Sequence, residues 1–150
     1  MTLGRALTIA LAVTAFLVVS FAVARWLTQD SRERSVVTDL LRAQARGDAS
    51  AMLALLDGCA AGTTCRSDVE RNAATLRGSG DLRIVRYDSS TARATGDRHG
   101  PTRVAWTRGA DQPVTVQCVT VDRRALALLG ADITLAAIGR PIQGEAACPR

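Results

Sequence analysis

The chain opens on a long apolar run that ends at a cluster of interface-type residues. Residues 6–24 carry no charge, and threonine and serine are their only polar side chains. As a helix this run rises about 28 Å, close to the ~30 Å hydrocarbon core of a bilayer. Arg25 and Trp26 follow, and both side chains suit a membrane interface. The pattern predicts a transmembrane anchor over residues 6–26, preceded by a short cytoplasmic tail, residues 1–5.

The same run also has one feature of a secretory signal peptide. Ala22-Val23-Ala24 forms an A-x-A triplet directly before Arg25. The apolar run is longer than the ~7–15 residues that signal peptides usually contain, which favours an anchor that is retained. Cleavage after Ala24 stays open as the alternative.

A polar spacer is expected at residues 27–30, followed by a helix with one apolar face. Asp30 or Ser31 is expected to cap this helix. Its apolar positions recur at steps of three and four residues between Val36 and Ala45, and Gly47 is expected to end it.

Two shorter helices are expected next. Asp48 is a suitable N-cap for a helix that closes at Asp57-Gly58. The segment SDVE at residues 67–70 matches a capping box and predicts a third helix that runs to about Arg77.

From Gly78 onward the period of the pattern changes from that of helices to that of strands. The segments expected as strands are DLRIVRYD, TRVAWTR, VTVQCVTV and ITLAAIGRPI, with STARAT at residues 90–95 as a weaker one. GDRHGP at residues 96–101 is expected to be a hairpin connection, and a turn or bulge is expected at Gly130-Ala131. Three helices followed by four to five antiparallel strands predict an α+β domain whose sheet packs on helices.

This order of elements, with the paired-helix segment VVTDLLRAQARGDASAMLALL, resembles the nuclear-transport-factor-2-like (NTF2-like, cystatin-like) superfamily. It is similar to the small membrane-anchored members found in the envelopes of high-GC Gram-positive bacteria, the actinobacteria. The resemblance covers residues 31–143 and implies a curved sheet wrapped on a long helix, forming a cone whose mouth can hold a small ligand. It places an extracytoplasmic domain at residues 31–150 and implies no single activity.

Four cysteines allow three pairings, and we expect disulfides between Cys59 and Cys65 and between Cys118 and Cys148. Neither spacing is that of a structural zinc site, and a redox dithiol would more typically be C-x-x-C. Disulfides require an oxidising compartment, so this interpretation places the domain outside the cytoplasm. The alternative is four free, buried thiols in a cytoplasmic domain.

The formal net charge of +5 first suggests nucleic acid, but its distribution argues against that partner. All 19 basic residues are arginine, and beyond Arg25 there are 17 of them against 14 acidic residues. Single-strand binders need aromatic platforms, and only Tyr87 and Trp106 are aromatic beyond Trp26. The arginines after the apolar run also oppose export by the positive-inside rule, so charge and cysteines disagree on the orientation.

No constellation of residues indicates catalysis, a metal or a cofactor. Local signatures of serine hydrolases, zinc proteases and phosphate-binding loops do not occur in the sequence. The acid-base candidates are Asp39, Asp57, Asp81, Tyr87 and His99. Asp39 is expected to face solvent from a helix, and Asp57, Asp81 and His99 are expected at a helix end, a strand end and a loop. If the cone is open, Trp106 and Tyr87 are the best candidates for contact with an apolar ligand.

The resemblance suggests a non-catalytic role, as an accessory or assembly subunit of a cell-envelope transport or secretion system with a protein partner. The alternative is a module that binds a small apolar ligand in the cone. An enzyme of the isomerase or dehydratase type comes third. A cavity lined by Trp106, Tyr87 and a buried carboxylate would favour the last two, and a cone filled by aliphatic side chains would favour the first.

Overall fold

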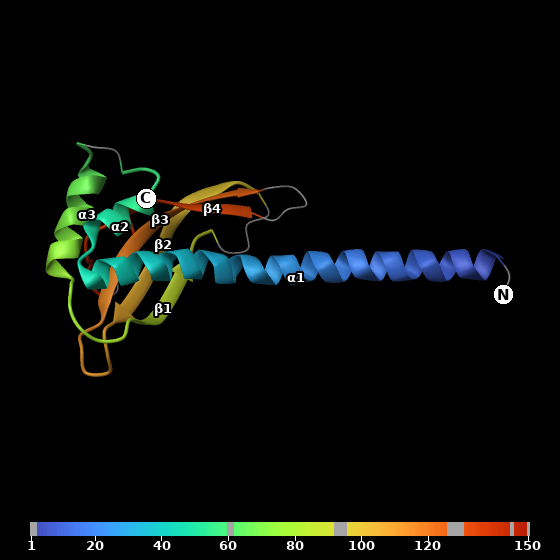
Figure 1. Ribbon diagram of the computed structural model, residues 1–150, viewed down its shortest axis with the longest axis horizontal. Helices are drawn as coiled ribbons and strands as arrows, with labels where there is room; N and C mark the ends of the chain where they lie inside the picture. Colours follow the sequence, from blue (N-terminus) through green and yellow to red (C-terminus); the bar gives the residue numbers. More distant parts are fainter. Residues whose placement is uncertain (1–2, 60–61, 92–95, 126–130, 145, 150) are drawn as a thin grey trace.

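The fold is given by a computed structural model that describes residues 3–59, 62–91, 96–125, 131–144 and 146–149, without the side chains of residues 3, 6 and 25–30. One helix, α1 (Leu3–Arg46), accounts for the first 44 of these residues. Its N-terminal half stands clear of the rest of the molecule, and its C-terminal half is part of the domain (Figure 1). Among the described residues, one helical span, Leu7–Ala24 within α1, is long and apolar enough to cross a membrane.

The continuity of α1 corrects two expectations. Residues 27–30 are helical rather than a spacer, and neither Asp30 nor Ser31 caps a new helix. The physical reason is that a cap satisfies amide groups left without partners at a helix start. Here the preceding turns already supply the carbonyl oxygens, and the segment contains neither glycine nor proline to interrupt them.

The second helix, α2 (Ala49–Ala54), begins as the sequence predicts. Gly47 ends α1 with a φ of 76°, a conformation that costs glycine little. The Asp48 side chain then accepts a 2.9 Å hydrogen bond from the Ala51 amide.

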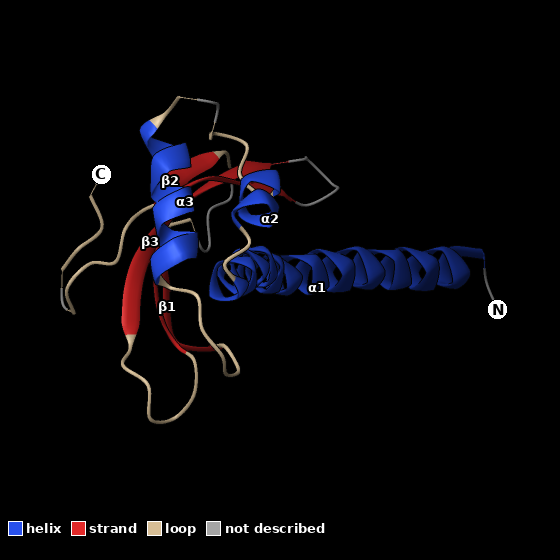
Figure 2. Ribbon diagram, turned by 60° about the vertical axis from the view of Figure 1, so that its left-hand side comes forward, coloured by secondary structure: helices blue, strands red, loops and turns tan. Residues whose placement is uncertain are grey.

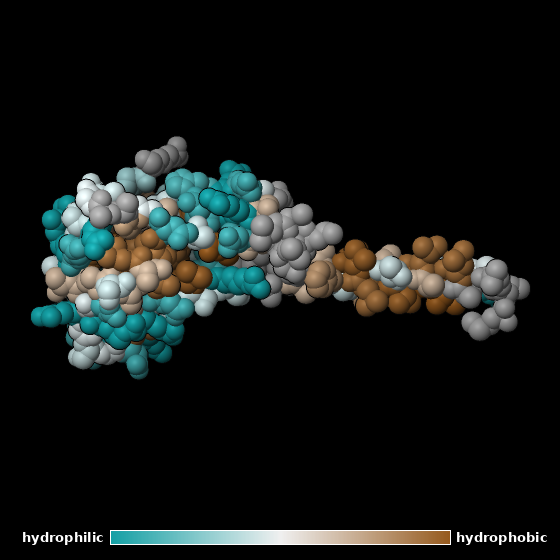
Figure 3. All heavy atoms as spheres, turned by 45° about the horizontal axis from the view of Figure 1, so that its top comes forward, coloured by the Kyte–Doolittle hydropathy of each residue, from teal (hydrophilic) through white to brown (hydrophobic). Residues whose placement is uncertain are grey.

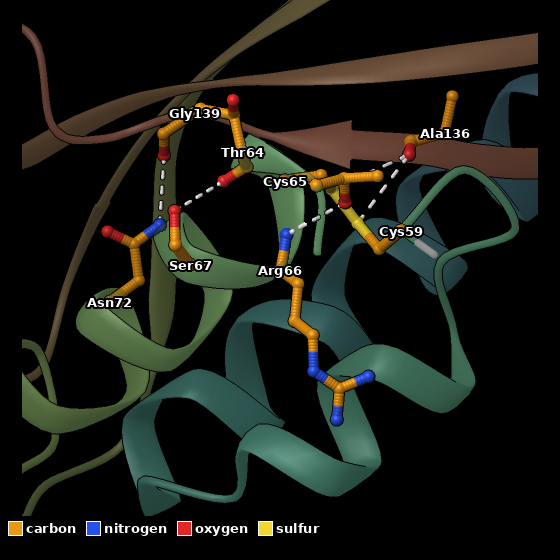
Figure 4. Close-up of a disulfide and its surroundings, with 9 residues drawn as sticks. Cys59, Thr64, Cys65, Arg66, Ser67, Asn72, Ala136 and Gly139 are labelled. Atoms are coloured by element: carbon orange, nitrogen blue, oxygen red, sulfur yellow. Dashed lines mark hydrogen bonds between the residues drawn. A yellow bond between two sulfur atoms is a disulfide. The ribbon is translucent and has the colours of Figure 1, made fainter. Parts of the chain in front are cut away.

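The third helix, α3 (Thr64–Thr75), begins earlier than the capping box predicts. Its N-cap is Thr63, whose side chain accepts a hydrogen bond from the Arg66 amide. Ser67, the expected cap, lies within the first turn and donates instead to the Thr64 carbonyl at 2.9 Å (Figure 4).

The sheet is an antiparallel meander with the strand order β1-β2-β3-β4. Its strands are β1 (Arg83–Ser89), β2 (Arg98–Thr107), β3 (Thr115–Ala125) and β4 (Ala131–Ile138). Together with the helices they confirm the predicted α+β class. Of the weaker strand expected over residues 90–95, residues 92–95 lie outside the described residues, and Ser90 and Thr91 are not in a strand. Gly130 also lies outside them, and Ala131 begins β4.

The hairpin connection expected at residues 96–101 is wrong, because β2 already begins at Arg98. His99 therefore lies in a strand, opposite Asp122 of β3. Glycine is needed at position 100 because a Cβ there would lie 2.3 Å from the Ser90 hydroxyl oxygen. This glycine does not mark a turn. Pro101 is tolerated because the pairing with β1 ends at Thr102, so that among the described strands this part of β2 pairs with β3 alone.

The hydrophobic core lies between the helices and the inner face of the sheet. Its largest fully buried apolar side chains come from α1, α2, β2 and β4: Leu40, Leu41, Met52, Trp106, Leu135 and Ile138. The C-terminal segment first pairs with the edge of β3, where Ile142 bridges to Val116. It then lies on the opposite, outer face (Figure 2), where Cys148 is bonded to Cys118 and Arg103 donates to carbonyl oxygens of the tail. The sheet is thus covered on both faces, by helices on one and by the tail on part of the other.

Candidate functional site: a buried carboxylate between helix and sheet

The most unusual side chain in the domain is Glu33, a carboxylate on α1 that is fully buried. Its Oε1 accepts hydrogen bonds from the Tyr87 hydroxyl and the Thr102 hydroxyl, both at 2.9 Å. Its Oε2 accepts from the Thr91 hydroxyl at 2.7 Å and from Nη2 of Arg123 at 2.9 Å. Two carboxylate oxygens offer about four acceptor positions, so these four donors, together with the Ser89 hydroxyl, saturate the group.

The donors come from three strands because of the register of the sheet. Tyr87 lies in β1 opposite Val104, and Thr102 lies in β2 opposite Val119, so both point to the inner face with the core valines. Arg123 extends the same face of β3, two residues beyond Val121. The helix therefore places one acid where three strands each present a donor.

The electrostatic state of Glu33 follows from two opposing effects. Burial by itself raises the pKa of the Glu33 carboxyl, because it removes water from the charged form. Hydrogen bonds from Ser89, Thr91, Tyr87 and Thr102 favour the charged form and outweigh burial, so the pKa lies below its ordinary value. Glu33 is ionised at neutral pH, paired with Arg123, and its oxygens are occupied by donors. This arrangement suits a structural clamp between helix and sheet rather than a general base.

A second buried polar cluster joins the other end of the helix to the sheet. Gln44 and Gln117 exchange two amide hydrogen bonds, at 2.8 and 3.2 Å. The Trp106 indole donates to the Gln117 side-chain oxygen at 2.9 Å. The Gly139 carbonyl accepts from both Gln117 and Asn72. Each cluster fixes the position of α1 over the sheet through side-chain groups that are specific in geometry.

The two residues predicted to contact an apolar ligand both face the inner side of the sheet. Trp106 is 1% exposed and packs within the hydrophobic core. Tyr87 is half-buried, with its hydroxyl on Glu33 and its ring 5.8 Å from the guanidinium carbon of Arg34. Their role in ligand binding stays a prediction, and the structure places both in contacts within the protein.

The other acid-base candidates are dispersed over the surface. Asp39 is exposed, as expected, and forms an ion pair with Arg42 at 3.1 Å. Asp57 and Asp81 are exposed. His99 is exposed and contacts Asp122 across the β2–β3 pair. No hydrogen bond or ion pair joins any two of these four candidates, which are all among the described residues, so they form no common site.

The structure joins Cys59 to Cys65 and Cys118 to Cys148, the pairing that the sequence predicts. Their Cα atoms are 5.2 and 5.7 Å apart, within the usual range for disulfides. In the first pair both sulfur atoms lie within 4 Å of the Ala136 carbonyl oxygen on β4 (Figure 4). The second pair attaches the C-terminal segment to β3. Over the described residues, no group of three metal-ligating side chains comes together.

Glu33 and Arg123 are the residues that sequence interpretation missed. Glu33 falls in the first turn of the helix that the sequence predicts to begin at Asp30 or Ser31, and an acid in a first turn is usually exposed. A sign was present, because Glu33, Val37, Leu40 and Gln44 follow one another at helical steps of four, three and four residues. Because Glu33 and Gln44 share one face of the helix with apolar residues, the pattern indicates that both are buried. Nothing in the local sequence identifies the partners of these two side chains.

Two open clefts were not expected from the sequence. One, of about 750 Å³, lies on the outer face between Asp88, Arg103 and the tail near Cys148. Another, of about 420 Å³, lies at the end of α1 beside Arg42, Arg46 and residues 78–82. Neither is lined by Trp106, Tyr87 or Glu33.

The fold and the site together define an α+β domain with an antiparallel four-stranded sheet, two disulfides and an N-terminal helix able to cross a membrane. Comparison with protein-family models, with curated proteins and with solved structures finds no match for the chain.

Proposed function

We propose that this chain is a single-pass membrane protein whose domain lies outside the cytoplasm and serves, without catalysis, as an accessory or assembly subunit of an envelope transport or secretion system. The observation that carries this proposal is that the buried polar side chains of the domain form hydrogen bonds with one another. The Glu33 carboxylate accepts four donors, and the Trp106 indole is buried and hydrogen-bonded.

The interior of the sheet supports a scaffold more than a binding cone. Aliphatic and sulfur-containing side chains occupy the space that a ligand would need, among them Leu40, Leu41 and Met52 from the helices. Close-packed interiors of this kind hold a shape that a partner can recognise.

The proposed location rests on the helix and the disulfides together. The span Leu7–Ala24 is exposed along its whole length, as expected for a helix that meets lipid. Two disulfides are typical of an oxidising compartment. A retained helix and oxidised cysteines together support a domain on the far side of the membrane, with residues 1–5 in the cytoplasm.

The two edges of the sheet differ, and this difference favours β1 as the surface that meets a protein partner. The β4 edge is covered by the chain after α2, where Leu56 bridges to Leu135 and the Asp57 amide donates to the Leu135 carbonyl. Within the described residues, β1 pairs only with β2, and Val85 on it is 61% exposed. An open edge strand accepts a further strand readily.

The experiment that tests the proposed location is thiol accounting by mass spectrometry on the full chain from native membranes, alkylated with and without prior reduction. We expect no alkylation without reduction, two disulfide-linked peptides, and an intact mass that retains residues before Arg25. Four thiols that react without reduction would contradict export, and a chain beginning at Arg25 would contradict the anchor.

A further inference from the structure

The two disulfides of the domain differ in what surrounds their sulfur atoms. Cys148 lines the outer-face cleft of about 750 Å³, whereas its partner Cys118 is 9% exposed in β3. In the other disulfide, the sulfur atoms of Cys59 and Cys65 lie 3.8 and 3.9 Å from the Ala136 carbonyl oxygen. The first disulfide thus presents one of its cysteines to an open cleft, and the second is turned toward a strand.

A cation lies beside the buried cysteine of the first disulfide. Arg103 of β2 is directly opposite Cys118 of β3, and residues paired in this way have Cβ atoms about 4.5–5.5 Å apart. The Arg103 side chain is 17% exposed, and its ion pair with Asp88 is long, at 3.5 Å. A guanidinium near a cysteine favours the thiolate, and a carbonyl oxygen disfavours it. Cys118 is therefore a good leaving group when the bond is attacked at Cys148.

The segment that this disulfide attaches is held by little else among the described residues. Residues 143–149 follow the pairing of Ile142 with β3. The disulfide and Arg103, which donates to two carbonyl oxygens of the tail, are what join this segment to the sheet. Apart from Cys148, which is half-buried, the described residues of the segment are exposed. Opening the disulfide would free the tail and leave the core intact.

We propose that Cys118–Cys148 is a thiol-exchange site, at which a dithiol reductant opens the bond and releases residues 143–149. One thiolate of the reductant attacks the Cys148 sulfur, and a mixed disulfide forms as the bond to Cys118 breaks. Cys118 leaves as a thiolate beside Arg103 and is then protonated. The reductant's second thiolate attacks its own sulfur in the mixed disulfide, so that Cys148 leaves as a thiolate and is protonated in turn.

This exchange balances without a further reactant. Two electrons pass from the dithiol to the protein disulfide, the two thiol protons end on the two cysteines, and the reductant is left as a disulfide. The reductant meets the oxidised domain outside the cytoplasm, so the inference rests on the location proposed above.

The test is timed reduction of the full chain, purified in the oxidised form in detergent micelles, with dithiothreitol at neutral pH. Free thiols are alkylated at each time point and located by peptide mass spectrometry. We expect Cys118 and Cys148 to be alkylated on the order of tenfold faster than Cys59 and Cys65, because access and leaving-group stability both favour the first pair.

Two variants isolate the charge of Arg103. Arg103→Lys and Arg103→Gln both lose the planar fork that contacts the tail, but only the lysine variant keeps the charge. The bond to Cys118 should therefore open roughly threefold or more faster in the lysine variant than in the glutamine variant. Arg86→Lys and Arg86→Gln are the matched controls, because Arg86 is an exposed arginine that also pairs with Asp88. These two should open at equal rates.

Hydrogen exchange of the selectively reduced chain reports release of the tail. The Ala146 amide donates to the Gln143 carbonyl within the tail, and the Ile142 amide donates to the Val116 carbonyl of β3, both at 2.8 Å. Exchange at Ala146 should rise on the order of tenfold after reduction, because its turn is no longer tied to the sheet. Exchange at Ile142 should be unchanged.

Opening of Cys59–Cys65 first, or of both bonds at one rate, would overturn the inference. Equal rates in the two Arg103 variants, or unchanged exchange at Ala146, would also overturn it. The sample taken from native membranes before reductant is added separates this inference from the proposed location. Four free thiols in that sample would contradict the location and this site together, whereas an intact bond that resists dithiothreitol would overturn the exchange site alone.

Discussion

At the scale of single residues, the Glu33 clamp shows how a buried charge is made acceptable in a small domain. An isolated carboxylate in an apolar core would be neutralised or expelled, because removing it from water is costly. Glu33 avoids this with one guanidinium and three hydroxyl groups, which come from three strands and the turn after β1. The arrangement ties the position of α1 to the register of the sheet.

Replacing this carboxylate with an amide tests the clamp. Glu33→Gln should lower the free energy of unfolding by about 3–5 kcal/mol, because the amide NH₂ faces donors and Arg123 loses its buried counter-ion. The measurement is denaturant unfolding of the full chain in micelles.

The control for this substitution is Glu70→Gln, which removes a carboxylate from an exposed ion pair with Arg66. Exposed pairs contribute about 0–1 kcal/mol, so this variant should unfold almost as the wild type does. Equal losses in the two variants would argue against a clamp at Glu33.

The pH dependence of stability offers a second test at this residue. The pKa of Glu33 is lowered in the folded state from an ordinary value of 4.5. Its contribution is thus complete above pH 4.5 and disappears as the pH falls through the folded pKa. The difference in unfolding free energy between wild type and Glu33→Gln should shrink as the pH falls below 4.5 and through the lowered pKa. A difference that grows on acidification would contradict this sign.

At the scale of elements, the β4 edge is protected by a close approach of the chain that follows α2. Gly58 makes this possible, because a Cβ at that position would lie 2.4 Å from the Ala136 carbonyl oxygen. The Cys59–Cys65 disulfide lies against the same carbonyl (Figure 4). Gly58, the disulfide and the Leu56–Leu135 bridge together cover the β4 edge, whereas β1 has β2 as its only strand partner among the described residues.

Gly58→Ala should therefore destabilise the domain by about 1–3 kcal/mol, the usual range for overpacking. Thermal unfolding with the disulfides intact measures the change. Gly144→Ala is the matched control, because nothing lies within 4 Å of the added Cβ there. Equal unfolding temperatures of the two variants would contradict this prediction, because they would show that the segment covering the β4 edge can move without loss of stability.

At the scale of the whole molecule, one helix serves both as the candidate span and as a core element of the domain. Figure 3 shows apolar residues along the N-terminal part of α1 and a mixed surface on the domain. Because α1 is continuous from Leu3 to Arg46, no loop separates the candidate span from the part of the helix that packs on the sheet. The two polar clusters, at Glu33 and at Gln44, hold the helix to the sheet at both ends of this contact.

Most of the elements could be predicted from local patterns, and the errors share one cause. The Asp48 cap, Gly47 and the alternation in β1 and β2 depend on neighbours in sequence, and these predictions are confirmed. The caps expected at Asp30 and Ser67 are wrong because other residues already accept from the backbone amides that these caps would satisfy. His99 was misplaced because Gly100-Pro101 resembles a turn in sequence, whereas the glycine is required by the Ser90 side chain beside it.

The sequence by itself determined the apolar span and the α+β order, because periodicity and hydropathy are properties of the chain. It left three cysteine pairings possible, and the structure shows the expected one. Only the tertiary structure decided which polar residues are buried together. Glu33 lies 90 positions from Arg123 and 69 from Thr102 in the chain. Their contact depends on the register of three strands and on the rotation of α1 above them. Such contacts are fixed by packing over the whole domain, and no local pattern contains them.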